Sequence, residues 1–175
     1  MMSRSKRIFL TLVIAVPIVL IIAYFTRDED KGLMNANDER IQTFLQSTTE
    51  GELEMDHFKR LGDSELFVAS FHLNRDGNVQ LGYSLLEEVK EGKVKNIRID
   101  FGAISQSFTL IEAEESTFGI LYGSDGKSWQ QAKVTFPQSA VTYTFEKPDE
   151  SFYLLQKELD SSIEDPEDYS IDYQD

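Results

Sequence analysis

The side chains that could do chemistry in this chain are two histidines and 31 acidic residues, and the chain contains no cysteine. His57 and His72 lack the spacing of a metal motif such as H-E-x-x-H. A zinc site without cysteine would need carboxylates as further ligands. We therefore expect no metal and no cofactor, and we expect His72 to be a surface or sheet-edge residue.

Two pairs of carboxylates, Glu87-Glu88 and Glu114-Glu115, are adjacent in sequence. Neighbours on a strand point to opposite faces, so neither pair can act on one substrate. The segment from Gly123 to Gly126 contains Ser124, but its residues are those that turns prefer. The sequence has no G-x-S-x-G, Walker A or G-x-G-x-x-G motif. We predict no catalytic residue.

Three aromatic residues are predicted to contact a ligand or a partner: Trp129, Tyr169 and Tyr173. Trp129, the only tryptophan, follows a turn and either covers the end of a sheet or forms a platform for a ligand. Residues 160–175 contain seven acids and no base, so this segment is predicted to be a disordered tail. Its tyrosines would order it on a partner; the alternative is a purely solvating tail.

The elements that position these residues are mainly strands. From Ser64 onward, apolar residues recur at every second position, with turns at Arg75–Asn78, near Gly92 and around Gly123. This pattern predicts an antiparallel β-sandwich or curled sheet of about eight strands. The predicted strands are centred on residues 66–73, 79–85, 97–101, 108–111, 118–122, 130–136, 141–145 and 151–156.

Two short helices are expected before the strands. Residues 35–46 place Ile41, Phe44 and Leu45 on one helical face, and Asn35 is the expected cap. Residues 52–61 place three further apolar side chains at helical spacing, namely Met55, Phe58 and Leu61.

An uncharged apolar run occupies residues 8–25, and 13 of its 18 residues are Leu, Ile, Val or Phe. These residues favour membrane insertion by roughly 4–8 kcal/mol, and the run is long enough to cross the hydrocarbon layer. Three basic residues precede it, which places the N-terminus inside. A cleaved signal peptide is the alternative, but bulky Tyr24 and Phe25 stand where its cleavage site needs small residues.

The expected organisation has five parts. They are a cytoplasmic basic end (1–7), a transmembrane signal anchor (8–25), a stalk (26–33), an extracytoplasmic α+β domain dominated by antiparallel strands (34–158) and an acidic disordered tail (159–175). After residue 25 the chain has 31 acidic and 14 basic residues, a net charge of −17. Such a charge disfavours nucleic-acid binding and permits attraction to a basic partner.

The segment Phe118–Gly123 and the later segment Ala132–Phe136 resemble strands of a loose group of small single-span surface proteins of Gram-positive bacteria. Leu66–Phe71 and Phe152–Leu154 fit the same pattern. The resemblance implies a β-rich exported domain, and it brings no activity and no catalytic residues.

These observations together predict a membrane-anchored extracytoplasmic module that binds, senses or regulates without catalysis. Its expected partners are membrane lipid, through residues 8–25, and a membrane protein or the cell wall. The alternative is an extracytoplasmic hydrolase with a carboxylate-based site, which the large number of acidic residues favours.

Overall fold

The computed structural model describes residues 32–103, 105–114, 116–124, 128–160, 163, 165 and 167–175. The chain divides into two units, Met1–Leu33 and Met34–Asp175, and only two residues of the first are described. The predicted anchor, residues 8–25, lies outside the described residues. In the part of the chain that is described, no helix has the length and apolar character needed to cross a membrane.

The described residues form one helix and eleven strands, arranged in three antiparallel sheets. Sheet A has the order β1-β5-β4-β3-β2, sheet B the order β10-β7-β6 and sheet C the order β11-β8-β9. The bounds are β1 Leu33–Asn35, α2 Asp38–Thr48, β2 Glu52–Arg60, β3 Leu66–Arg75, β4 Asn78–Lys90, β5 Lys93–Ala103, β6 Gln106–Glu112, β7 Thr117–Ser124, β8 Gln131–Phe136, β9 Val141–Glu146, β10 Phe152–Leu159 and β11 Ser170–Gln174.

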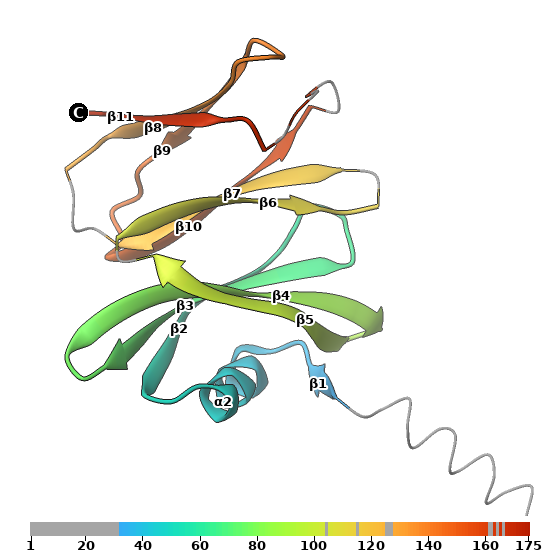
Figure 1. Cartoon of the computed structure of the whole chain (residues 1–175). Coiled ribbons are helices and arrows are strands. Elements are labelled where there is room, and N and C mark those ends of the chain that lie inside the picture. The colour runs from blue at the N-terminus through green and yellow to red at the C-terminus, as the bar shows by residue number, and fades with distance from the viewer. Residues whose placement is uncertain are drawn as a thin grey trace, which may run out of the picture. The chain divides into compact units, whose positions relative to one another are not determined.

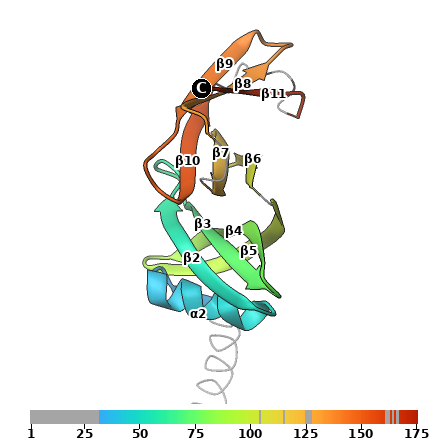
Figure 2. The same ribbon diagram turned by 90° about the vertical axis from the view of Figure 1, so that its left-hand side faces the viewer.

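The second unit is built in layers, with α2 on sheet A, sheet A on sheet B and sheet B on sheet C (Figures 1 and 2). Each interface has its own apolar cluster. One cluster joins α2 to sheet A, a second joins sheets A and B, and a third, rich in aromatic residues, joins sheets B and C. The mostly β prediction is confirmed, with eleven strands among the described residues in place of about eight.

Helix α2 forms where the first helix is predicted. Its cap is Asn37 rather than Asn35, because the Asn37 side chain accepts a hydrogen bond from the Arg40 amide at 3.0 Å. Ile41 and Leu45 are fully buried against sheet A, as their spacing predicts.

The prediction of a second helix is wrong, because residues 52–60 form strand β2, which pairs with β3. A β-bulge lies between Met55 and His57 and inserts one extra residue into the strand. Met55 and Phe58, three positions apart, therefore both pack against the cluster under α2. The bulge converts the two-residue spacing of a strand into the three-residue spacing that suggests a helix.

The predicted hairpin turn at Arg75–Asn78 is confirmed. Asp76 and Gly77 have φ values of 54° and 79° and join β3 to β4. Two positive φ values in a two-residue loop are typical of a type I′ turn, whose twist matches that of the flanking strands.

Strand β7 is the central strand of sheet B and is buried on both faces. Ile120 and Tyr122 belong to the cluster shared with sheet A, whereas Leu121 belongs to the cluster shared with sheet C. Gly123 leaves room for the Tyr153 ring, which occupies the space that a side chain would need. Burial on both faces explains why this strand is a continuous apolar run in the sequence.

Residues Ser170–Gln174, which their composition assigns to a disordered tail, form β11 and pair with β8. Ile171 and Tyr173, two positions apart, pack against the aromatic cluster between sheets B and C. Asp172 between them is exposed. Burial therefore alternates along β11, as in a half-buried edge strand. The surrounding acidic residues hide this pattern in the sequence.

Candidate functional site

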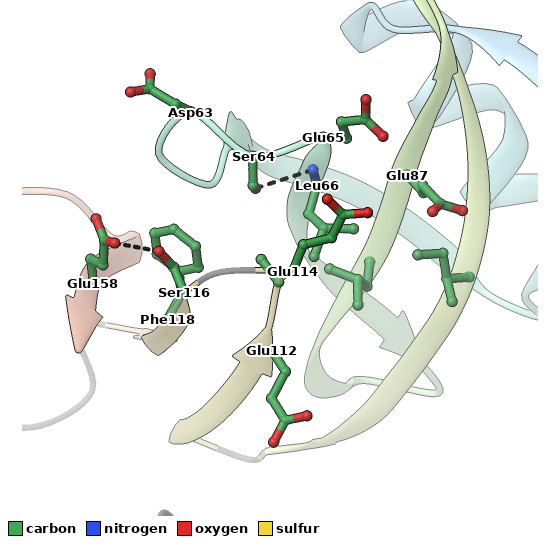
Figure 3. A pocket seen from close by; sticks show the side chains of 13 residues that line it. Asp63, Ser64, Glu65, Leu66, Glu87, Glu112, Glu114, Ser116, Phe118 and Glu158 are labelled. Atoms are coloured by element: carbon green, nitrogen blue, oxygen red, sulfur yellow. Dashed lines mark hydrogen bonds between the residues drawn. The ribbon is translucent and has the colours of Figure 1, made fainter. Parts of the chain in front are cut away.

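A cleft with a volume of about 660 Å³ opens between sheets A and B. Segments of sheet A and its β2–β3 loop line one side, and the β6–β7 turn with the end of β10 lines the other (Figure 3). Its lining includes six acidic residues and no basic residue, and we call it the acidic cleft. The acids are Asp63, Glu65, Glu87, Glu112, Glu114 and Glu158.

The acidic cleft combines a charged rim with apolar side chains. All six acidic residues are exposed to solvent, whereas Leu66 and Leu85 are half-buried and Phe118 is buried. Ile97 adds an apolar side chain that is 50% exposed. A bulge in β5 presents Ile97 to the cleft, because the pairing with β4 passes over this residue.

A tight loop between β2 and β3 positions Asp63 and Glu65. Gly62 enters this loop with a φ of 53°, a conformation that favours glycine. The Ser64 hydroxyl donates to the Leu61 carbonyl at 2.6 Å and accepts from the Leu66 amide at 3.2 Å. These local hydrogen bonds hold the loop in one conformation, and they hold its two carboxylates at the rim.

The opposite side of the cleft is formed by the turn between β6 and β7. The Ala113 amide donates to the Ser116 carbonyl at 2.8 Å, which closes the turn. The Ser116 hydroxyl donates to the Glu158 carboxylate and so ties the turn to β10 (Figure 3). Glu112 and Glu114 therefore project from a turn that is held at both ends.

The electrostatics of the cleft favour a positively charged ligand. Six carboxylates around one opening create a negative potential that attracts cations from solution. Lys95 lies opposite Glu87 in the β4–β5 register and offsets part of this charge from outside the lining. Among the described residues, no group of three or more acidic, histidine or cysteine side chains has the geometry to hold a metal ion.

Both histidines contact Phe152, at a second place where sheet A meets the start of β10. The His57 Nε2 atom lies 2.9 Å from the Phe152 carbonyl oxygen and 3.3 Å from the Glu150 carboxylate. His72 is not a surface or edge residue, since β3 lies between β2 and β4 and the His72 side chain is only 18% exposed. Its ring stacks on that of Phe152.

His72 lies between two carboxylates. Its Nδ1 is 2.9 Å from Asp56, and its Nε2 is 3.6 Å from Glu54. Burial raises the pKa of the Asp56 carboxyl, and the hydrogen bond with His72 opposes this shift. A catalytic histidine would direct its second nitrogen at a nucleophile, but here that nitrogen faces Glu54. The arrangement serves to join sheet A to β10.

The three aromatic residues predicted as contacts all lie at the aromatic cluster between sheets B and C. Trp129 is only 4% exposed, and its ring centroid lies 5.7 Å from that of Tyr173. Tyr169 contacts the Phe108 ring at 4.9 Å and donates to the Phe108 carbonyl at 3.3 Å. Trp129, Tyr169 and Tyr173 thus all pack against their own chain.

Sequence reasoning missed the acidic cleft, because its residues come from five separate segments of the chain. The adjacent acids in the sequence do not indicate this cleft. For one pair, the prediction that neighbouring acids face different sites is confirmed. Glu87 lines the cleft, whereas Glu88 accepts a hydrogen bond from Arg60. Only the pairing of the sheets brings Glu87 near the β6–β7 turn.

No protein-family model matches this chain, and neither the curated proteins nor the solved structures contain a match to it. The resemblance to single-span proteins of Gram-positive bacteria stays a prediction.

Proposed function

We propose that this protein is a membrane-anchored extracytoplasmic binding module, and that the acidic cleft binds a cationic ligand without catalysis. The observation that carries the proposal is the lining of the cleft, which combines six carboxylates with exposed and half-buried apolar side chains. The apolar run at residues 8–25 supports the anchor, and the basic residues before it support an external domain.

The lining favours a ligand with both positive charge and apolar surface, such as a basic peptide segment of a membrane or cell-wall partner. A volume of about 660 Å³ lies within the range of sites that hold small ligands or a few side chains. Leu66, Leu85 and Ile97 would contact the apolar part of such a segment. The carboxylates would pair with lysine or arginine, each contact contributing about 1 kcal/mol in water.

The direct test measures binding of a labelled peptide of alternating lysine and leucine to the full chain. The expected result is saturable binding that weakens as salt is added, because salt screens exposed charges. A peptide of alternating glutamate and leucine should not bind. The combined variant Glu87→Gln/Glu114→Gln should weaken binding roughly tenfold.

The matched control is Glu91→Gln, which removes an exposed carboxylate from the β4–β5 turn, outside the cleft. It should leave the affinity for the lysine–leucine peptide unchanged. If Glu91→Gln and a single cleft variant such as Glu87→Gln lowered the affinity equally, only the net charge of the protein would matter. That result would contradict the cleft as the binding site.

The anchor is tested separately by fractionation of cells that produce the full chain. We expect the protein in the membrane fraction after an alkaline wash, and we expect deletion of residues 8–25 to release it. Recovery of the full chain in the soluble fraction would contradict the anchor and leave the binding test unaffected.

A carboxylate-based hydrolase is the second candidate, because Glu87 of sheet A and Glu114 of the β6–β7 turn line one cleft. Glycoside hydrolysis uses two such carboxylates, about 5–10 Å apart. Incubation of the full chain with cell-wall polysaccharide, followed by assay of new reducing ends, tests this function. Turnover that Glu114→Gln abolishes would favour the hydrolase over the binding module.

A further inference from the structure

Strand β6 forms one edge of sheet B, and its pairing with β7 shows which of its backbone groups are used. The Ser124 amide donates to the Ser105 carbonyl before β6, and the Ala113 amide donates to the Ser116 carbonyl after it. In an antiparallel pair, residues that bond the partner strand alternate with residues that face away from it. The odd-numbered residues of β6 therefore bond β7, and the amides and carbonyls of the even-numbered residues face outward.

This outward row is open at the end nearest the acidic cleft. The Phe108 carbonyl accepts a hydrogen bond from the Tyr169 hydroxyl. The amides and carbonyls of Leu110 and Glu112 have no hydrogen-bond partner among the described residues. Glu112, the last residue of β6, also lines the acidic cleft (Figure 3). An unpaired row of this kind can add an extended peptide as a new strand.

The opposite edges of sheets A and B, β2 and β10, are bonded by side chains of the same chain. On β2, the Gln42 side chain donates to the Leu53 carbonyl at 2.7 Å and accepts from the Met55 amide at 2.6 Å. On β10, the Leu154 carbonyl accepts from the Lys59 side chain at 3.4 Å. In the part of the chain that the structure describes, the cleft end of β6 has no such cover.

A second edge, on β9 of sheet C, shows what is particular to β6. By the same alternation, Thr142 and Thr144 face away from β8. Strand β9 contains one acidic residue, Glu146, and its neighbour β8 contains Lys133. Beside β6, in contrast, the lining of the acidic cleft has six acidic residues and no basic residue. The charge therefore favours a basic segment at β6 over one at β9.

We propose that the outer edge of β6 adds an extended segment of a basic partner protein as a fourth strand of sheet B. This inference rests on the proposed function, because lysine or arginine side chains of the segment pair with the carboxylates of the acidic cleft. The outward backbone groups of Leu110 and Glu112 supply the hydrogen bonds of the new strand pair. The cleft thus selects positive charge, and the strand edge selects an extended backbone.

Backbone N-methylation of the lysine–leucine peptide tests the strand addition. In an extended peptide of alternating lysine and leucine, all lysine amides face one edge and all leucine amides face the other. One peptide is methylated at every lysine amide and a second at every leucine amide, so both keep the charge of the unmodified peptide. Binding to the full chain should weaken roughly tenfold for one of them and stay unchanged for the other, because only one row of amides faces β6.

Equal affinities of the two methylated peptides would overturn the strand addition, whether both match the unmodified peptide or both are weaker. If both match it, the acidic cleft binds the peptide by charge alone, and the proposed function stands. If the unmodified peptide itself does not bind, the proposed function is wrong, and the strand addition is wrong with it.

Amide hydrogen exchange locates the added strand. It is measured by nuclear magnetic resonance on the full chain in detergent micelles, with and without saturating unmodified peptide. The peptide should slow exchange of the Leu110 and Glu112 amides about tenfold or more. The matched controls are the outward amides of Thr142 and Thr144 on β9, whose exchange should not change. Saturable binding without slower exchange at Leu110 and Glu112, or equal slowing on β9, would overturn the proposal.

Discussion

The imidazole ring of His72 lies parallel to the phenyl ring of Phe152, with the ring centroids 4.1 Å apart and the planes inclined by 7°. The contact joins β3 of sheet A to β10 of sheet B. Strand β2, the neighbour of β3, is also joined to β10, by side chains that donate to backbone carbonyls. Lys59 donates to the Leu154 carbonyl at 3.4 Å, and Gln156 donates to the Arg60 carbonyl at 3.1 Å.

The first prediction concerns this junction. His72→Ala removes the stacked ring and leaves the Asp56 carboxylate without its hydrogen-bond partner. The expected loss is about 2–3 kcal/mol in the free energy of unfolding, measured by urea denaturation. Phe152→Leu keeps the apolar contact and should lose less. Additive losses in the double variant would contradict a direct interaction between the two rings.

The second prediction is a pH dependence that Asp56 controls. Burial raises the pKa of Asp56 above its ordinary value of 3.8, so the folded state binds a proton more readily than the unfolded state. Asp56 therefore lowers stability as pH rises through 3.8 and the range just above it. Asp56→Asn should gain stability relative to the native chain toward neutral pH and lose that gain below pH 3.8.

Denaturant titrations of both proteins at a series of pH values measure this difference. Glu54→Gln is a suitable control, because its side chain is 78% exposed and contacts the other nitrogen of His72. The prediction is contradicted if the free energies of unfolding of Asp56→Asn and the native chain differ by the same amount at every pH. In that case the pKa of the Asp56 carboxyl is the same in the folded and unfolded states.

The third prediction concerns the release of β11 at alkaline pH. Burial raises the pKa of Tyr173 above 10.0, and neighbouring Tyr169 raises it further. The folded state therefore loses stability as pH rises above 10.0, where the unfolded tyrosine ionises first. Trp129, the only tryptophan, should then show a red-shifted emission as water reaches its ring.

Tyr173→Phe should move this fluorescence change to higher pH, because phenylalanine cannot ionise. Burial also raises the pKa of Tyr83, which lies in the cluster between sheets A and B. Tyr83→Phe is therefore the control, and it should leave the pH of the Trp129 change where it is. If Tyr83→Phe moved the pH of the change and Tyr173→Phe did not, the alkaline opening would lie between sheets A and B, and the prediction would be wrong.

The fourth prediction concerns the packing of β7. An added methyl group at Gly123 would overlap the Tyr153 ring, so Gly123→Ala should destabilise the fold by about 1–3 kcal/mol. Ser124→Ala, at the end of the same strand, should cost much less. Thermal unfolding measures both, and a combined Gly123→Ala/Tyr153→Leu variant should recover part of the loss.

Strands with alternating burial could be predicted from the sequence, because one face packs and the other meets water. Strand β8 is the clearest case, since Ala132, Val134 and Phe136 are buried and the residues between them are partly exposed. The β3–β4 hairpin could be predicted from its turn, since Asp76-Gly77 supplies two positive φ values. Strand β2 could not be predicted in this way, since its bulge shifts the alternation by one residue. The acidic residues around β11 conceal a strand that is held by three aromatic or aliphatic side chains.

The candidate site was less accessible from the sequence than the fold. Glu65, Glu87 and Glu114 share a cleft only because two sheets stack, and no short-range pattern encodes that stacking. The clustering of Trp129 with Tyr173 likewise depends on the pairing of β11 with β8.

The order of strands within the three sheets has a consequence for how the chain can assemble. Sheet A and α2 come from one continuous stretch, residues 33–103. Sheet B is completed only by β10, which follows the β8–β9 hairpin of sheet C in the chain. Until β10 arrives, the β6–β7 hairpin has apolar side chains on both faces and an unpaired edge. Such a hairpin is prone to pair with other chains. Sheet B, which lies between the other two sheets in the folded protein, is thus the layer most prone to aggregation during synthesis.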